Sequence, residues 1–262
     1  MLANEQILRS EGSLFITKAI DMPPNYIDDW HTHQWHQIVF PLTGLLQTNI
    51  DVKSFIVPHN GLLYIPANTI HRSVAVTNTK FLAIYLNPNT IVEYRDELKS
   101  CLVTPFLKTL ILELFDEKST QNTQNTFTNL LTVLRDQIEL AKNFNIPILI
   151  PRDRRLLSIF HQLQNQPNLA FTLAQWAIKV GASERTLSRV CAKEFNQSFS
   201  SWRQNVRLVL SLQLLNKNIS ILEIAMDLGY KSDSSFIYAF KQLFLKTPNR
   251  YRKEYLFQHI TT

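Results

Sequence analysis

The sequence predicts an α+β protein of two domains: a small β-barrel with trailing helices, followed by an all-α domain. A length of 262 residues suits two ordinary domains better than one large domain. Short apolar runs separated by Pro, Gly and Asn fill residues 13–86, and apolar residues recur at helical spacing after residue 91. From residue 151 onward, 16 Lys and Arg accompany 7 Asp and Glu, whereas the first 150 residues hold 11 and 14. The basic half predicts a polyanionic partner, although a solvated charged surface would give the same balance.

Seven short strands are expected in the first domain, because apolar and β-branched runs are bounded there by turn residues. The expected strands are residues 14–20, 38–42, 45–50, 54–57, 62–65, 73–77 and 81–86. Many short strands at this spacing are typical of a small sandwich or barrel.

Two groups of histidines accompany these strands. His31, His33 and Gln37 share one parity, so on a single strand their side chains would point inward while His36 points outward. The second group lies further along the chain and consists of Gly61, Pro66 and His71. The spacing resembles the two motifs of the cupin family, with Gln37 at the position that is usually acidic.

This resemblance implies a cupin-like, effector-sensing domain over residues 1–145. In a metal-binding cupin the ligands would map to His31, His33, Gln37 and His71. Imidazole suits a divalent metal such as Zn, Ni or Fe, whereas neutral Gln is a poorer ligand than a carboxylate. The alternative is that these side chains line a pocket for an organic effector or bond to one another. The aromatic residues expected to wall such a pocket are Trp30, Trp35, Phe40 and Tyr64.

The chain changes to a helical period after the strands. Apolar stripes within residues 103–114 and 130–140 predict two helices in the region of about 91–145. Cys101 and Cys191 lie in segments with helical core spacing, so no disulfide is expected between them. Residues 146–152 contain two prolines and predict a semi-rigid linker.

A helix-turn-helix pattern opens the second domain, which is expected over residues 153–262. At about 172–195, Thr172 can cap one helix, Gly181 ends it and Ser183 can cap the next. Before this unit, Asp153 can cap a helix over residues 154–165.

A second pattern of the same kind is expected at about 220–245. Ser220 and Glu223 predict a capping box, and Gly229 ends the helix. Leu222, Ala225 and Leu228 are expected on the buried face of that helix. A long amphipathic helix over residues 202–215 would connect the two units.

The second domain resembles the DNA-binding domain of the AraC family of bacterial transcription regulators. The resemblance covers roughly residues 152–253. The residues that match the family pattern are Ser183, Arg185, Leu187, Arg189, Arg207, Leu214, Leu215, Ile224, Ala225, Gly229, Tyr230, Phe236, Phe240, Lys241, Thr247, Pro248, Tyr251 and Arg252. Asn196 and Leu245 depart from it, since the family usually has Gly at both positions. Asn tolerates positive φ, whereas Leu245 predicts a reshaped turn.

The same resemblance implies roles for exposed residues of both units. Residues expected to read bases are Arg185, Ser188, Arg189, Asp233, Ser234 and Tyr238. Residues expected to contact the DNA backbone are Lys231, Lys241, Lys246 and Arg250. Many relatives carry Arg at the position of Tyr238, so a contact of this ring with a thymine methyl or a phosphate stays open. For Arg207 we expect a structural salt bridge.

The expected function is a transcription regulator that binds double-stranded promoter DNA in a sequence-specific way and responds to a small-molecule effector. The family resemblance implies a homodimer formed by the trailing helices, contact with RNA polymerase if the protein activates, and a transporter or efflux gene as target. Packing of those helices on their own barrel is the alternative.

Two other functions stay open: a metal-dependent cupin enzyme and a metal-sensing regulator. No apolar run of 18 residues and no signal-peptide pattern occurs, so we expect a cytoplasmic protein without membrane contact, and no enzyme.

Overall fold

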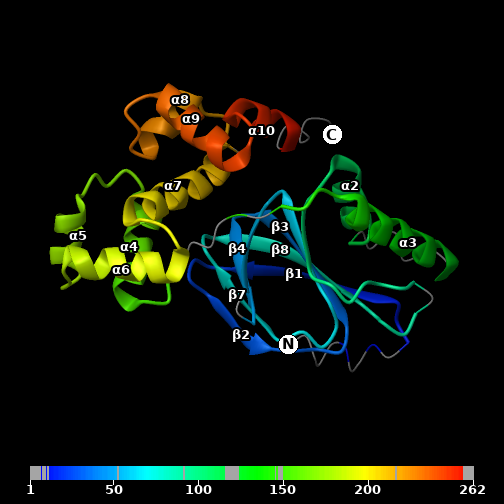
Figure 1. The fold of residues 1–262 in the computed structure, drawn as a ribbon. Coiled ribbons are helices and arrows are strands. Elements are labelled where there is room, and N and C mark those ends of the chain that lie inside the picture. The colour runs from blue at the N-terminus through cyan, green and yellow to red at the C-terminus, as the bar shows by residue number, and fades with distance from the viewer. Residues whose placement is uncertain are drawn as a thin grey trace. The chain divides into compact units, whose positions relative to one another are not determined.

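The computed structural model describes residues 7, 10, 12–51, 53–90, 92–115, 124–144, 146, 150–215 and 217–255. They form two compact units, Met1–Ile146 and Pro147–Thr262, drawn in blue to green and in green to red in Figure 1. Residues 147–149 of the expected linker lie outside the described residues. Within the described ranges, no helix combines the length and the apolar character needed to cross a membrane.

The first unit contains two antiparallel sheets (Figure 1). The five-stranded sheet has the order β1-β8-β3-β6-β9, and the four-stranded sheet has the order β2-β7-β4-β5. The strands are β1 Phe15–Met22, β2 Ile27–His31, β3 His36–Thr43, β4 Leu45–Ile50, β5 Lys53–Pro58, β6 Gly61–Ile65, β7 His71–Ala75, β8 Thr79–Leu86 and β9 Lys99–Leu102. All seven expected strands are present, one of them (residues 45–50) with the expected bounds and six with shifted ends, which confirms an antiparallel β-sheet domain.

Two strands were missed by the sequence analysis, β2 and β9. The β2 segment carries Asp28 and Asp29, and acidic residues are depleted in strands. The β9 strand has four residues, too few for a period, and forms by pairing with β6, where Cys101 lies opposite Leu62. The helical environment predicted for Cys101 is therefore wrong, whereas Cys191 is buried on a helix as expected.

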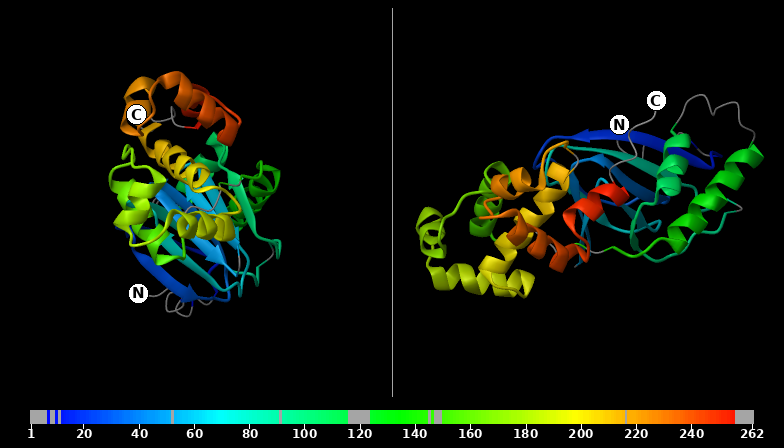
Figure 2. Two further views of the ribbon diagram at one scale, coloured as in Figure 1. Left: turned by 60° about the vertical axis from the view of Figure 1, so that its left-hand side comes forward. Right: turned by 90° about the horizontal axis from the view of Figure 1, so that it is seen from above.

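Both faces of the five-stranded sheet are buried. Val39, Leu63 and Ala83 point toward the four-stranded sheet and pack in one core with its residues Leu46 and Val57. The opposite face packs against helices α2 (Pro105–Glu113) and α3 (Gln124–Leu140), through Ile38, Leu62, Ile84, Leu107, Ile111, Leu131 and Leu134. Figure 2 shows these two helices beside the strands. The trailing helices therefore cover their own barrel.

The second unit consists of helices. They are α4 Arg154–Asn165, α5 Leu173–Lys179, α6 Glu184–Phe195, α7 Phe199–Leu215, α8 Ile221–Asp227, α9 Asp233–Phe244 and α10 Pro248–Tyr255. The expected N-caps Asp153, Thr172, Ser183 and Ser220 are confirmed, because each side chain accepts a hydrogen bond from a backbone N–H of the first turn. One detail of α8 was wrong: Leu222 is 50% exposed, and Ile224 is buried in its place.

The two helix-turn-helix units, α5–α6 and α8–α9, turn at Gly181 and Gly229. Both glycines have positive φ, 64° and 75°. A Cβ at Gly229 would also lie 2.9 Å from Asn168 Cα, so this position needs Gly for space as well as for conformation. The reshaped turn expected at Leu245 is not found: Leu245 ends α9 at φ 58°, in the same left-handed conformation as Asn196 at the end of α6 (φ 53°).

Candidate nucleic-acid interface and metal centre

The first recognition helix, α6, presents a basic face. Its buried residues Leu187, Val190 and Cys191 pack inward. Arg185, Ser188 and Arg189 are all exposed on the other side, together with Ala192, at i, i+3, i+4 and i+7. A helix of this kind fits the major groove, where Arg can bond bidentately to guanine.

The second recognition helix, α9, buries Phe236, Ala239 and Phe240. Ser234 is exposed and Tyr238 is 69% exposed, whereas Asp233 is half-buried at the start of the helix. Asp233 Oδ1 accepts hydrogen bonds from Ser234 N (2.6 Å) and Ser234 Oγ (3.2 Å). The Asp233 carboxylate is thus held by its own helix.

The cationic residues expected at the DNA backbone flank this helix. Lys231 lies before it, Lys241 lies on its last turn, and Arg250 lies on α10; all three are exposed. Lys246 is half-buried in the turn between α9 and α10.

Arg207 makes a contact of another kind than the salt bridge expected. Its Nε donates to Pro167 O at 2.6 Å and its Nη2 donates to Leu169 O at 2.8 Å. The partners are backbone carbonyls of the segment before α5, so Arg207 fixes the first helix-turn-helix unit on α7. No local sequence pattern marks a backbone acceptor, because every residue type offers one.

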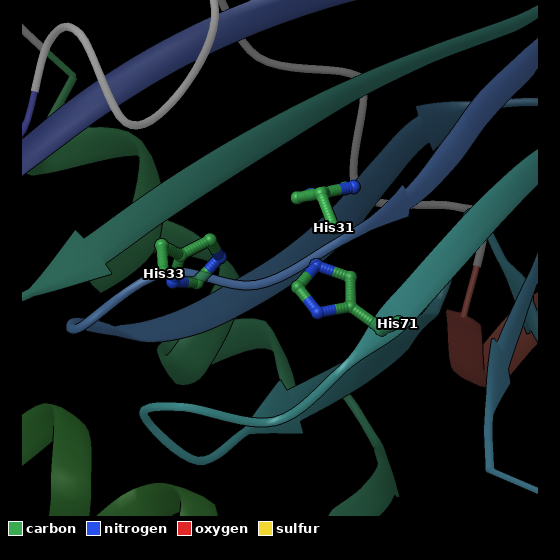
Figure 3. A group of neighbouring side chains, drawn as sticks. All are labelled: His31, His33 and His71. Atoms are coloured by element: carbon green, nitrogen blue, oxygen red, sulfur yellow. The ribbon is translucent and has the colours of Figure 1, made fainter.

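Three histidines meet in the first unit, as Figure 3 shows. His31 ends β2, His33 lies in the segment before β3, and His71 begins β7. One ring nitrogen from each lies within 4.8 Å of the others. The ring centroids of His31 and His71 are 4.3 Å apart, and those of His33 and His71 are 5.2 Å apart. Pairing of β2 with β7 places His31 opposite His71 across a β-bulge, which brings these distant segments together.

The hydrogen bonds of the three rings define their tautomer. The Nδ1 atoms of His31, His33 and His71 lie 2.7, 2.6 and 2.9 Å from the backbone carbonyls of Asp29, Trp35 and Thr69. A carbonyl only accepts, so each Nδ1 carries a proton, and in the neutral form of each ring Nε2 has the free lone pair. Metal-binding histidines are oriented by this type of bond.

Burial holds two of these rings in the neutral form that binds metal. Removal from water lowers the pKa of His71 to about 4 and lowers that of His33 below its ordinary value. His71 Nε2 is buried and has no hydrogen-bond partner among the residues that the structure describes. A buried nitrogen lone pair without a donor is costly unless a ligand uses it. The three histidines therefore fit a divalent metal ion.

Gln37 takes a different place from the one expected of a ligand. Its side-chain amide lies 3.1 Å from His33 Nε2, the nitrogen that a metal would need. The amide atom nearest to Nε2 is Gln37 Oε1, so a hydrogen bond to the lone pair of a neutral His33 ring requires the amide to turn and present its NH₂ group. Gln37 therefore supports His33 in this structure and does not join the three converging nitrogens.

Two groups that the sequence analysis missed also border the cluster: Tyr85, whose ring centroid is 5.2 Å from that of His33, and Asp28, whose Oδ2 is 4.0 Å from His31 Nε2.

The expected aromatic pocket wall is divided between two places. Trp35 packs in the core between the two sheets, whereas Phe40 and Tyr64 pack in the core under α2 and α3. They do not line one pocket, because they lie on opposite faces of the five-stranded sheet. Trp30 is 47% exposed and carries the Arg72 guanidinium over its ring at 5.3 Å.

His36 was expected to point outward, and it does so, but its side chain is buried there. It points to the helix-covered face, where its Nδ1 accepts from Ala67 N at 3.0 Å and lies 2.8 Å from the Tyr64 hydroxyl. Strand parity was right in separating His36 from Gln37, but the outward face of β3 is covered by α2 and α3.

A barrel with a ligand-type histidine cluster, joined to two helix-turn-helix units in a basic domain, defines a DNA-binding regulator with a sensor domain. Residues 16–144 match the AraC-like ligand binding domain family, and residues 176–254 match a helix-turn-helix domain family. The chain belongs to the AraC family of transcription regulators and is a DNA-binding regulator with a ligand-binding domain.

Two similar proteins are named as HTH-type transcriptional regulators. The chain is 26% identical over 221 residues to the HTH-type transcriptional regulator NimR of Escherichia coli strain K12, a match covering 84% of this chain and 81% of NimR. It is 26% identical over 128 residues to the HTH-type transcriptional regulator MtrA of Neisseria gonorrhoeae, covering 48% of this chain and 42% of MtrA. Among solved structures, ToxT from Vibrio cholerae aligns at a TM-score of 0.40 with 10% identity, over 93% of this chain and 99% of ToxT.

Proposed function

We propose that this regulator binds promoter DNA in a sequence-specific way through α6 and α9, under the control of a small-molecule effector bound in its barrel. The observation that carries the proposal is the pair of recognition helices, which expose different side chains on equivalent faces within the basic unit. Arg185 and Arg189 read guanine, Ser188 contacts a neighbouring base, and Ser234, Tyr238 and Asp233 read the second half of the site.

The cationic residues around α9 hold the protein on the duplex without selecting a sequence. Lys231, Lys241, Lys246 and Arg250 contact phosphates. Each such contact releases a counterion, so affinity falls steeply as salt rises.

A chain of hydrogen bonds offers a route from the histidine cluster to α3. His71 is bonded to Thr69 O, and Asn68 N donates to His33 O at 2.8 Å. In the same loop, Ala67 N donates to His36, which lies against Tyr64. The Tyr64 hydroxyl is 2.8 Å from Arg95 O, and Arg95 Nη1 is 2.6 Å from Glu139 Oε2 on α3. A ligand that moves the loop of residues 66–69 would therefore shift the packing of α3.

Control of DNA binding follows if α3 takes part in a homodimer. A shift of α3 would change the spacing of two DNA-binding domains, and the effector acts by preferring one of the two arrangements. The apolar side chains Val133 and Leu140 are exposed on α3, which suits a second copy of the chain. The expected target is a transporter or efflux gene, with contact to RNA polymerase where the protein activates, in the cytoplasm.

A metal-sensing regulator is the second candidate, and the three Nε2 lone pairs favour it. His31, His33 and His71 would hold Zn, Ni or Fe, and the ion would supply a fixed positive charge that draws the three rings together. Gln37 would have to release His33 Nε2. A cupin enzyme is the remaining alternative, and substrate turnover by purified protein without specific DNA binding would establish it.

The test is selection of genomic fragments by the full-length protein, with and without extracted metabolites and with Zn²⁺, Ni²⁺ or Fe²⁺ added to metal-stripped protein. We expect specific fragments, and a change in affinity of about fivefold or more when the controlling ligand is present. In the metal-sensing case His71→Ala abolishes the response and the binding of Zn²⁺, whereas His161→Ala, a histidine of α4, leaves both unchanged. Equal affinity for selected and scrambled duplexes contradicts the DNA-binding proposal, and a metal response that survives in His71→Ala contradicts metal sensing.

A further inference from the structure

The two recognition helices can be aligned residue by residue. Both have 12 residues, follow a Ser N-cap and end in a left-handed residue. Ser183 corresponds to Ser232 and Asn196 to Leu245, an offset of 49 in both cases. Positions on the exposed face of α6 therefore have direct equivalents on α9.

The equivalent positions differ in chemistry. Arg189 corresponds to Tyr238, and Ser188 corresponds to Ile237, which is partly exposed. The centre of the exposed face is thus basic and polar on α6 but apolar on α9. Tyr238 is 69% exposed, although the neighbouring aromatic residues Phe236 and Phe240 are fully buried. A partly exposed Ile beside an exposed Tyr ring, on a helix that the proposed function places in the major groove, points to an apolar target there.

The hydroxyl of Ser234 is restricted in what it can recognise. It donates to Asp233 Oδ1, so its remaining capacity is that of an acceptor. In the major groove, amino groups that could donate to it belong to adenine and cytosine, and the apolar feature is the C5-methyl group of thymine.

We propose that the second recognition helix reads thymine methyl groups through Ile237 and Tyr238. Ser234 accepts a hydrogen bond from an adjacent base amino group, which adenine supplies in an A·T-rich half-site. The inference rests on the proposed function, because it requires α9 to lie in the major groove. It assigns to Ile237 a specificity role, and it makes the two half-sites different: guanine is read by α6 and thymine by α9.

Uracil substitution tests the proposal directly, because uracil differs from thymine only in lacking the methyl group. The full-length protein and its best fragment from the selection are used, with each thymine of the protected region replaced in turn. Loss of one contacted methyl should weaken binding about fourfold. The loss should occur at one or two positions, all in the half-site covered by α9.

Two variants assign the contacts. Ile237→Ala and Tyr238→Ala should each become insensitive to uracil at one position. The matched control is Ser188→Ala, the equivalent change on α6, which should keep the full sensitivity to uracil. Thermal unfolding of each variant verifies that it is folded. The uracil scan of the unaltered protein changes only the DNA, so its result does not depend on whether a variant folds.

The outcomes separate this inference from the proposed function. If binding stays sensitive to guanine replacement in the other half-site but no uracil substitution matters, the thymine reading is wrong and specific DNA binding stands. Uracil sensitivity that persists unchanged in both variants also overturns it. If no fragment binds better than scrambled duplex, the proposed function itself fails.

Discussion

The two helix-turn-helix units have the same scaffold and expose different residues. In both, a Ser caps a 12-residue recognition helix, and a glycine with positive φ separates it from the preceding helix. The exposed faces differ, with Arg185 and Arg189 on α6 and Ser234 and Tyr238 on α9. The features that are repeated stabilise the units, whereas the features that differ are available to select a sequence.

An arginine from a later helix fixes each unit in the same way. Arg207 bonds to Pro167 O and Leu169 O before the first unit, at 2.6 and 2.8 Å. Arg252 bonds to Leu215 O and Ile219 O before the second, at 3.1 and 2.8 Å. The repeat therefore includes the segment that leads into each unit.

The largest expected effect is on stability. Replacement Arg207→Met removes two charge-assisted bonds and leaves two carbonyls without that partner, which should lower the free energy of unfolding by about 3 kcal/mol. Arg252→Met should cost about 2 kcal/mol, because one of its bonds is longer. Scanning calorimetry of the full chain measures both, with the exposed Arg154→Met as a control. Equal and small losses in all three variants would show that the carbonyl contacts do not hold the units.

The next effect concerns base selection. Arg189→Ala should lose about 1–3 kcal/mol of discrimination at one guanine, because the bidentate contact that we propose is removed. Tyr238→Ala should leave discrimination at that guanine unchanged and relax the other half-site. Competition binding with single-base variants of the operator measures both. A loss that is equal at every position for Arg189→Ala would contradict base reading by this residue.

The third effect concerns the proposed contacts with the DNA backbone, which substitutions at equivalent positions of α6 and α9 should remove or add. Lys241 corresponds to Ala192, so Lys241→Ala should weaken binding to all sequences alike and reduce the salt slope by about one. Ala192→Lys should increase that slope by about one, because it adds a phosphate contact on α6. Titrations at several salt concentrations test both changes. A salt slope that neither variant alters would remove Lys241 from the interface.

The smallest expected effect concerns the residues that end α9 and α6, Leu245 and Asn196. Leu245 is 84% exposed and holds a left-handed conformation that disfavours β-carbon-bearing residues, so Leu245→Gly should raise the free energy of unfolding by about 1 kcal/mol. Asn196→Gly should change the free energy of unfolding by only about 0.3 kcal/mol, because Asn tolerates the left-handed conformation. Calorimetry distinguishes the two. Destabilisation by Leu245→Gly would mean that the side chain makes a contact worth more than the strain.

The first unit was less accessible to sequence reasoning. The seven strands with regular patterns were found, but β2 contains acidic residues and β9 is short, so both depend on the strands they pair with. His36 and Gln37 were assigned to opposite faces of β3 correctly, but the sequence did not indicate that the outward-facing His36 is buried. Parity identifies which side chains share a face, and packing of α2 and α3 decides whether that face meets water.

The sequence by itself determined the helical domain, because caps, glycine turns and apolar periods act over a few residues and can be read locally. It also determined the charge that makes this domain suited to DNA. Only the tertiary structure decided which ring nitrogens converge at the histidine cluster and which backbone carbonyls receive Arg207 and Arg252. Those partners come from segments far apart in the chain, and their meeting depends on strand pairing and helix packing that no local pattern records.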